Sequence, residues 1–193
     1  MHHIYHTEGI ILGSRNSGEA GKYYYIFTRD VGMITASAQG VRKMSSKLRF
    51  VLQDYAYVKI DLVKGRDLWR VTSASKTNLL ENISKNTATL RVFSNISRLL
   101  KRLLAGEDPN QNLFADVLNG LFVLEKSGTK DELHNIEAVM VLRILNNLGY
   151  IGEEKDLGVL MESPFADTLI FEASKNRAKM LSEINKALKQ TDL

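Results

Sequence analysis

The sequence contains no cysteine, and this absence removes several classes of chemistry at once. Disulfide bonds, Cys-ligated zinc and thiol catalysis are excluded for this sequence. No apolar run approaches the roughly 18 residues that a membrane-spanning helix needs. The N-terminal MHHIYHTEG also lacks the long apolar stretch of a secretory signal. We therefore expect a cytoplasmic protein without a membrane partner.

Motifs of catalytic sites are missing as well. The sequence has no HExxH, no Gly-x-Ser-x-Gly and no paired His/Asp set that would activate a nucleophile. The segment SGEAGKYY resembles a phosphate-binding loop, but Asn16 stands where that loop needs glycine and Tyr23 where it needs Ser or Thr. The histidines form no metal-ligating pattern. We predict no catalytic residue, no metal site and no cofactor, and thus a protein that is not an enzyme.

Acidic residues are scarce in the first part of the chain. The net charge of the whole sequence is +4. Residues 1–80 contain 12 Lys and Arg against 6 Asp and Glu, whereas residues 81–193 contain 14 against 16. A basic first part and a slightly acidic second part indicate two domains with different partners.

Residues 7–76 have the pattern of short β-strands. Apolar, aromatic and β-branched residues occur in short runs, and turn-forming residues at 30–32 and 64–67 separate some of them. Five short antiparallel strands favour a small closed barrel, of which the OB-fold is the commonest of this size. The expected strands are residues 8–14, 23–28, 33–38, 51–63 and 68–73.

From about residue 84 the apolar period becomes helical, with apolar residues three or four positions apart. We expect Gly106 and Pro109 to end the first helix, Asp131 to N-cap the third and Gly149 to end it. Residues 151–173 are ambiguous. The fold class is therefore α+β, with a five-stranded OB-fold β-barrel domain at residues 1–79 followed by an all-α helical domain at residues 80–193. The apolar stripes are Leu90, Phe93, Ile96, Leu100 and Leu103; Leu113, Val117, Leu121 and Leu124; Leu133, Ile136, Met140, Ile144 and Leu148; and Leu181, Ile184 and Leu188.

Four cations crowd into the basic segment, which we define as GVRKMSSKLR at residues 40–49, between the third and fourth expected strands. No acidic residue occurs between residues 31 and 53. Lys and Arg contacts with phosphates supply affinity without reading sequence, so the segment favours a nucleic-acid partner. The alternative is a solvated loop that happens to be positive. The candidate phosphate-binding residues are Arg42, Lys43, Lys47 and Arg49, with Lys22 and Arg15 as helpers.

Aromatic residues are concentrated in the same part of the chain. Bases stack on exposed aromatic faces of OB barrels, at about 1–3 kcal/mol per base, although core packing is the commoner role of any single aromatic residue. Because side chains alternate along a strand, Tyr23, Tyr24 and Tyr25 cannot all point inward. The sequence does not decide which of them faces outward, and Tyr24 is included among the candidate nucleic-acid-binding residues.

Several short motifs are specific when taken in order. The GIIL strand is followed by Arg15, Glu19 and Lys22, then by FTRDVG at residues 27–32. QGVRKMSSKLRFVLQDY at residues 39–55 is similar to a Gly-x-Arg, Ser-(Lys/Arg)-Leu, Leu-Gln-Pro-Phe signature. TSAS at 72–75 and LRILNNLGY at 142–150 complete the set. Together these motifs resemble the RecO family, the recombination mediators of the bacterial RecF pathway.

Some positions depart from the pattern of that family. Asp54 stands where proline usually follows Leu-Gln, Gln39 where lysine often precedes the glycine, and Gly21 where an acidic or small polar residue is common. The first two departures make this region less positive without removing the basic segment. Many members are longer at the C-terminal end and carry a four-Cys zinc module, which a sequence without cysteine cannot form.

The resemblance implies a DNA-repair function. It implies binding of single- and double-stranded DNA, annealing of complementary strands without ATP, and help in loading recombinase onto gaps coated by single-stranded-DNA-binding protein. The implied partners are RecR and the C-terminal tail of single-stranded-DNA-binding protein, and the implied location is the nucleoid within the cytoplasm. Two alternatives stay open: an OB-fold adaptor that binds acidic protein partners rather than DNA, and an enzyme with an unrecognised site.

Overall fold

The computed structural model describes residues 3–152 and 155–191. The chain divides into two compact units. The barrel unit comprises Met1–Ser84 and Ser97–Gln111, and the helical unit comprises Lys85–Ile96 and Asn112–Leu193. This division places a helical stretch in the barrel unit. The sequence instead predicts a boundary between residues 79 and 80, and that boundary stays a prediction.

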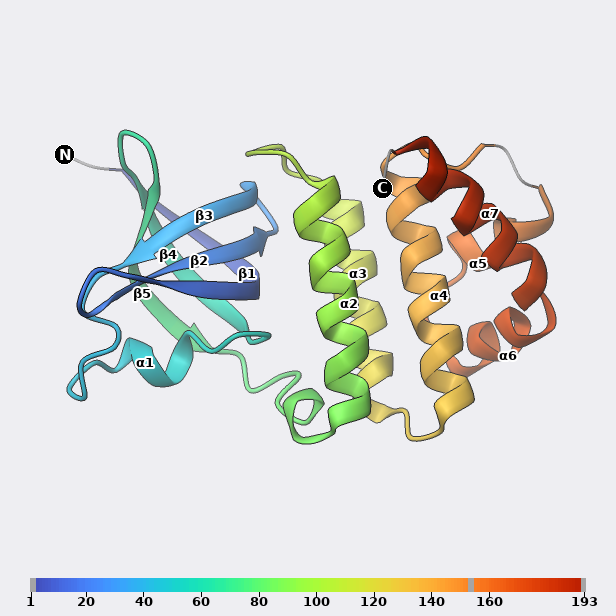
Figure 1. Cartoon of the computed structure of the whole chain (residues 1–193), viewed down its shortest axis with the longest axis horizontal. Helices are drawn as coiled ribbons and strands as arrows, with labels where there is room; N and C mark the ends of the chain where they lie inside the picture. The colour runs from blue at the N-terminus through green and yellow to red at the C-terminus, as the bar shows by residue number, and fades with distance from the viewer. Residues whose placement is uncertain (1–2, 153–154, 192–193) are drawn as a thin grey trace. The chain divides into compact units, whose positions relative to one another are not determined.

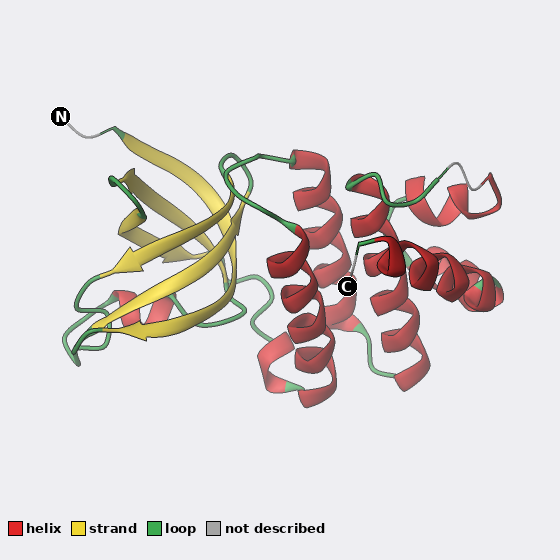
Figure 2. Cartoon of the chain, turned by 45° about the horizontal axis from the view of Figure 1, so that its top comes forward, coloured by secondary structure: helices red, strands yellow, loops and turns green. Residues whose placement is uncertain are grey.

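Five strands of the barrel unit form a closed barrel (Figures 1 and 2). Neighbouring strands are antiparallel except for one parallel pair, β3 with β5, and β4 closes the barrel by pairing with β1. The order β1-β2-β3-β5-β4 is that of an OB-fold, so the predicted fold class is confirmed. The strands are β1 (Ile4–Ser17), β2 (Gly21–Thr28), β3 (Gly32–Ala38), β4 (Tyr57–Lys64) and β5 (Trp69–Lys76).

Alternation of side chains builds the barrel core. Along β3, Ile34, Ala36 and Ala38 are buried, while the residues between them are partly exposed. Each buried Val, Leu or Ile contributes about 1.5–3 kcal/mol relative to an exposed one. The core consists of Ile11, Tyr24, Ile26, Ile34, Ala36, Ala38, Val41, Leu52, Val58, Ile60, Leu62, Trp69 and Val71.

The start of the fourth predicted strand is wrong. Val51, the first residue of the strand predicted at 51–63, is the last residue of helix α1 (Leu48–Val51), and β4 begins only at Tyr57. Leu52 is buried in the barrel core, and Leu48 and Val51 pack against that core. These apolar residues are spaced three and four positions apart, so they fit one side of a helical turn. In a run this short, the sequence alone does not distinguish that pattern from a strand.

The segment after α2 (Thr87–Leu103) is tied to the barrel by Glu107. Its carboxylate accepts hydrogen bonds from the indole Nε1 of buried Trp69 at 2.8 Å and from Nζ of Lys64 at 2.6 Å. At Gly32, which has φ of +82°, a Cβ atom would lie 2.6 Å from the backbone oxygen of Asp108. The β2–β3 turn therefore needs glycine both for its conformation and for this close approach.

The helical unit is built around α4 (Lys130–Asn147), which packs against α5 (Gly158–Glu162), α6 (Asp167–Lys175) and α7 (Arg177–Gln190). It also contains α3 from its second residue onward (Gln111–Lys126) and the first part of α2. Short 3-10 turns occur at η1 (Ile83–Lys85) and η2 (Lys155–Leu157). Within the described ranges, no helix is long and apolar enough to cross a membrane.

The helix pattern predicted from the apolar stripes is confirmed, with one correction at a cap. Thr129, not Asp131, is the N-cap of α4, and its side chain and that of Glu132 form a capping box. Asp131 lies in the first turn, where a negative charge is favoured by the helix dipole. Gly149 follows the end of the helix with φ of +78°, as predicted. The ambiguous residues 151–173 contain η2, α5 and most of α6, and residues 153–154 lie outside the described ranges.

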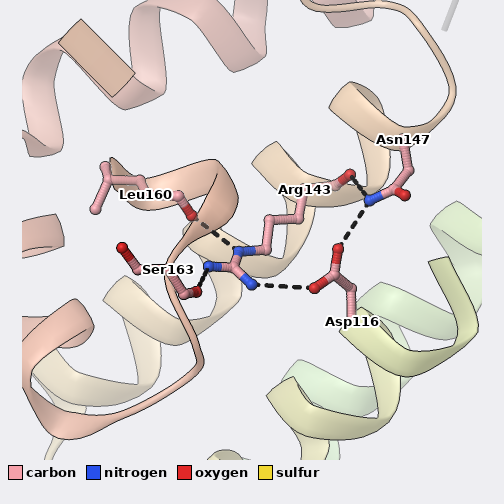
Figure 3. A network of polar contacts seen from close by, with 5 residues as sticks. All are labelled: Asp116, Arg143, Asn147, Leu160 and Ser163. Atoms are coloured by element: carbon pink, nitrogen blue, oxygen red, sulfur yellow. Dashed lines mark hydrogen bonds and ion pairs between the residues drawn. The ribbon is translucent and has the colours of Figure 1, made fainter. Parts of the chain in front are cut away.

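A buried arginine connects the helices of this unit (Figure 3). Arg143 on α4 is 4% exposed; its Nε donates to the Leu160 carbonyl at 2.8 Å, and it also donates to the Ser163 carbonyl. Nη1 of Arg143 donates to Asp116 of α3 at 3.0 Å, and Asn147 donates to the other oxygen of Asp116 at 2.9 Å. Each nitrogen of the buried guanidinium thus has a hydrogen-bond partner. This is the condition for burying a charge without a large loss of folding stability.

We expect Arg143→Met to destabilise the helical unit by about 2–3 kcal/mol, because two carbonyls and a partly buried carboxylate lose their donor. Urea unfolding followed by far-UV circular dichroism measures this change. Trp69 is the only tryptophan and lies in the barrel unit, so its fluorescence monitors the other unit separately. Lys175→Met, which removes an exposed ion pair with Glu172, is the matched control and should change stability by only about 0.5 kcal/mol. Equal effects of the two substitutions would contradict the role of the network.

We also expect protonation of the Glu107 carboxylate to lower the stability of the barrel unit in acid. The hydrogen bond from Lys64 holds the pKa of the Glu107 carboxyl below its ordinary value of 4.5, and the bond from Trp69 acts in the same direction. A lowered folded pKa means that this contribution is fully present above the ordinary value and is lost as pH falls through the folded value. Urea unfolding followed by Trp69 fluorescence should show wild type more stable than Glu107→Gln at pH 7, by about 1 kcal/mol or less. The difference should vanish at strongly acidic pH, and a difference that persists there would exclude this carboxylate as its source.

Candidate nucleic-acid interface

The basic segment lies between β3 and β4, as predicted, and ends within α1. A series of tight turns shapes it: the amide of Lys43 donates to the Gly40 carbonyl, and the amide of Ser46 donates to the Lys43 carbonyl, both at 3.0 Å. Val41 is buried in the barrel core at one end of the segment, and Leu52 is buried just beyond the other. These two apolar side chains hold the segment on the barrel while its polar side chains face water.

All four cations of the basic segment are exposed. In the described part of the chain, none of them forms an ion pair with a carboxylate. Some other cations of the barrel are paired: Arg29 lies 2.8 Å from Glu8, and Lys64 is bound to Glu107. Lys59, Arg66 and Arg70 are also exposed without an ion pair among the described residues; what distinguishes Arg42, Lys43, Lys47 and Arg49 is that they lie within eight positions of the sequence.

A groove of about 470 Å³ lies beside the first half of the segment. The backbone amide of Arg42 donates to the Ala20 carbonyl at 2.9 Å, and its guanidinium approaches the Gly18 carbonyl at 3.5 Å, so the β1–β2 connection is attached to the segment. The groove is lined by Ser17, Glu19, Ala20, Gly21, Lys22, Tyr23, Ser37, Ala38, Gln39, Gly40, Lys43 and Leu68. In OB-folds, the face of strands 2 and 3 with the connections 1–2 and 4–5 is the usual binding surface.

Four of the six predicted cations gather around this groove. Lys22 and Lys43 line it, and Arg42 is bonded to its rim. Arg15 is exposed on β1 opposite Tyr23, with its guanidinium carbon 5.1 Å from the centre of that ring. Lys47 and Arg49 are not brought into the groove; Lys47 is the N-cap residue of α1 and Arg49 lies within that helix. The candidate surface is therefore the groove together with the exposed side of α1.

The structure corrects the placement of Tyr24. Its side chain is 1% exposed in the barrel core, and burial, with a contribution from Asp54, raises its pKa to about 12. No face of this ring is open to a base, so the prediction of Tyr24 as a nucleic-acid-binding residue is wrong. Tyr23 and Tyr25 are partly exposed, which confirms that the three tyrosines do not all point inward.

Tyr23 is the groove residue that the sequence reasoning missed. It lines the groove and carries Arg15 over its ring. A signal was present in the sequence, because Tyr24 has the parity of Ile26 on β2 and Tyr23 does not. Apolar Ile26 marks the inward positions of this strand.

A second groove, of about 680 Å³, lies within the helical unit between the end of α3, the start of α4 and α6. Phe165 and Ile170 contribute apolar surface, Lys126 contributes a cation, and Asp131 and Glu132 contribute carboxylates. Asn135 also lines this groove, and its buried Oδ1 atom has no hydrogen-bond partner among the described atoms. Across residues 3–152 and 155–191, no group of three or more His, Cys, Asp or Glu side chains is placed to hold a metal ion.

The fold and the surface define the class of protein: an OB-fold barrel with an exposed cationic segment, joined to a helical unit. Residues 1–79 match the family model described as Recombination protein O N terminal, and residues 85–154 match the one described as Recombination protein O C terminal. The chain belongs to the RecO family.

Curated relatives carry the same family name. The chain is 28% identical over 144 residues to the DNA repair protein RecO of Acetivibrio thermocellus, covering 75% of this chain and 57% of the relative. It is 29% identical over 150 residues to DNA repair protein RecO of Heliobacterium modesticaldum, covering 78% and 53%. For DNA repair protein RecO of Thermodesulfovibrio yellowstonii the values are 29% over 156 residues, 80% and 61%. The matched region spans little more than half the length of these relatives.

The two neighbouring tyrosines of β2 should respond oppositely to substitution. We expect Tyr24→Ala to destabilise the barrel unit by about 3–5 kcal/mol, because it empties a core position. Tyr23→Ala should change stability by less than about 1 kcal/mol, because that side chain lies on the outer face. Urea unfolding followed by Trp69 fluorescence compares them, and similar losses for both variants would contradict the inward orientation of Tyr24.

Proposed function

We propose that this protein binds single- and double-stranded DNA and anneals complementary strands without ATP, as a DNA-repair mediator of the RecF pathway. The observation that carries the proposal is the basic segment, with four exposed cations and no ion-pair partner among the described carboxylates. Membership of the RecO family supports it, since the relatives are named DNA repair proteins.

The proposed activity needs no bond to be made or broken. Lys and Arg side chains that bind phosphates release the counterions condensed on DNA, and this release drives binding. Two strands whose phosphates are neutralised repel each other less, so base pairing itself then completes annealing. The protein therefore requires placed positive charge rather than a catalytic group, and it is proposed not to be an enzyme.

We further propose that the protein helps to load recombinase onto gaps coated by single-stranded-DNA-binding protein. The proposed protein partners are RecR and the C-terminal tail of single-stranded-DNA-binding protein. The groove of the helical unit has apolar walls that would suit an amphipathic tail, and Lys126 offers one cation, whereas Asp131 and Glu132 of the same lining disfavour a strongly acidic tail. The nucleoid, within the cytoplasm, is the proposed place of action.

The alternative is an OB-fold adaptor that binds acidic protein partners rather than DNA. The unpaired cations support it equally by charge, because carboxylates and phosphates both bind Lys and Arg. The two functions differ in a simple measurement, since an adaptor would ignore bare oligonucleotides at moderate salt.

We expect the double substitution Arg42→Glu with Lys47→Glu to weaken binding to a single-stranded oligonucleotide and to flatten its salt dependence. Each phosphate contact that is lost should reduce the slope of log affinity against log salt by roughly 0.7. Fluorescence anisotropy titrations over a range of salt concentrations measure the slope. The rate of pairing of two complementary oligonucleotides, with no nucleotide added, should fall in parallel.

A matched control separates the site from total charge. Lys59→Glu with Lys76→Glu makes the same change in net charge at two exposed positions of β4 and β5. This control should keep most of the salt slope of the wild type. If the Arg42 and Lys47 substitutions leave the slope unchanged, the DNA site lies elsewhere; if the wild type does not accelerate pairing at all, annealing is not its function.

A further inference from the structure

Helix α1 and the turns before it expose apolar surface beside the cations of the basic segment. Phe50 is 63% exposed and Met44 is 82% exposed, more than any other large hydrophobic side chain described in the barrel unit. The core-facing positions of this region are Leu48, Val51 and Leu52. Phe50 is therefore not used to hold α1 on the barrel, and its ring is available to a ligand.

One cation lies beside this ring, and a second is close to it in sequence. The guanidinium carbon of Arg49 lies 5.8 Å from the centre of the Phe50 ring, and Nη1 of Arg49 lies 2.7 Å from Sδ of Met44. The exposed Lys47 is three positions before Phe50 in the sequence. An isolated exposed aromatic residue carries little information. A flat apolar ring beside unpaired cations is different, because it suits a ligand that has flat rings and negative charges at short spacing.

We propose that Phe50 is a base-stacking residue, on which an unpaired base of single-stranded DNA stacks while Lys47 and Arg49 bind the neighbouring phosphates. This inference rests on the proposed DNA-binding function and adds a preference for unpaired bases. The bases of a duplex are already stacked on one another and offer no free face to the ring. An acidic peptide would satisfy the cations but would leave the ring without a matching surface.

Stacking on Phe50 is compatible with annealing. The ring contacts the face of the base, so the edge that forms Watson–Crick hydrogen bonds stays free for a second strand. Once that strand pairs, the base becomes part of a duplex stack and leaves the ring. Phe50 would thus favour the substrate of annealing over its product, which allows the duplex to be released.

The test compares Phe50→Ala with the wild type on three ligands: an unstructured single strand, a duplex, and a deoxyribose-phosphate chain without bases. We expect affinity for the single strand to fall about 5- to 150-fold, the range for losing one stacked base. Affinity for the duplex and for the chain without bases should not change. The salt slope should also stay the same, because no cation is removed. Phe50→Trp should retain single-strand affinity.

Matched controls exclude unspecific effects. Phe171→Ala removes a ring of similar exposure, 62%, from the helical unit and should leave single-strand affinity unchanged. Circular dichroism and Trp69 fluorescence confirm that each variant is folded. An oligonucleotide containing 2-aminopurine reports stacking directly, since its fluorescence should be quenched by the wild type more than by Phe50→Ala.

Two results would overturn the inference: unchanged single-strand affinity in Phe50→Ala, or equal losses on all three ligands. The companion substitution Arg42→Glu with Lys47→Glu distinguishes this failure from failure of the proposed function. If that charge variant loses affinity and Phe50→Ala does not, only the stacking inference fails. If neither variant changes binding, the DNA site itself lies elsewhere on the protein.

Discussion

The burial of two apolar side chains, Val41 and Leu52, is the constraint on which the candidate interface depends. Each is 2% exposed and belongs to the barrel core. Between them lie four cations that repel one another and have no carboxylate partner among the described residues. Without apolar anchors at both sides, such a segment would gain little from lying on the barrel. The hydrophobic effect thus holds in place a charge distribution that electrostatics alone would oppose.

The barrel unit uses positive charge in two distinct ways. Arg29 and Lys64 have carboxylate partners, and the Lys64 pair with Glu107 also satisfies the indole of Trp69. The cations of the basic segment have none in the described part of the chain. A cation whose charge is already neutralised has less to gain from a phosphate, so the unpaired set is the better ligand for a polyanion. Arg29 and Lys64 are thus placed to stabilise the fold, whereas the clustered, unpaired cations of the basic segment are the better candidates for binding a polyanion.

The fold was largely predictable because period and length dominate the strand and helix patterns, whereas the failures lie where tertiary context decides. In the sequence, Val51 begins an apolar run that predicts a strand, but α1 forms there because Leu52 is buried in the barrel core and Leu48 packs against that core. Tyr24 is polar enough to face water, yet its parity with Ile26 places it inside. The groove could not be predicted, since it joins β2, β3 and three connections, and one of these, the β4–β5 connection with Leu68, is distant in sequence.

The arrangement of the surface bears on how an annealing protein would avoid trapping its product. Lys22 and Lys43 line a groove, Arg15 lies over the ring of Tyr23 at that groove, and Arg49 lies beside the exposed Phe50 ring on α1. Phosphate contacts bind single and double strands alike, so they alone would hold the duplex after pairing. A contact with the face of a base is lost when that base enters a duplex. In the proposed function, the cations would bring strands together, and the loss of stacking on pairing would weaken the hold on the product.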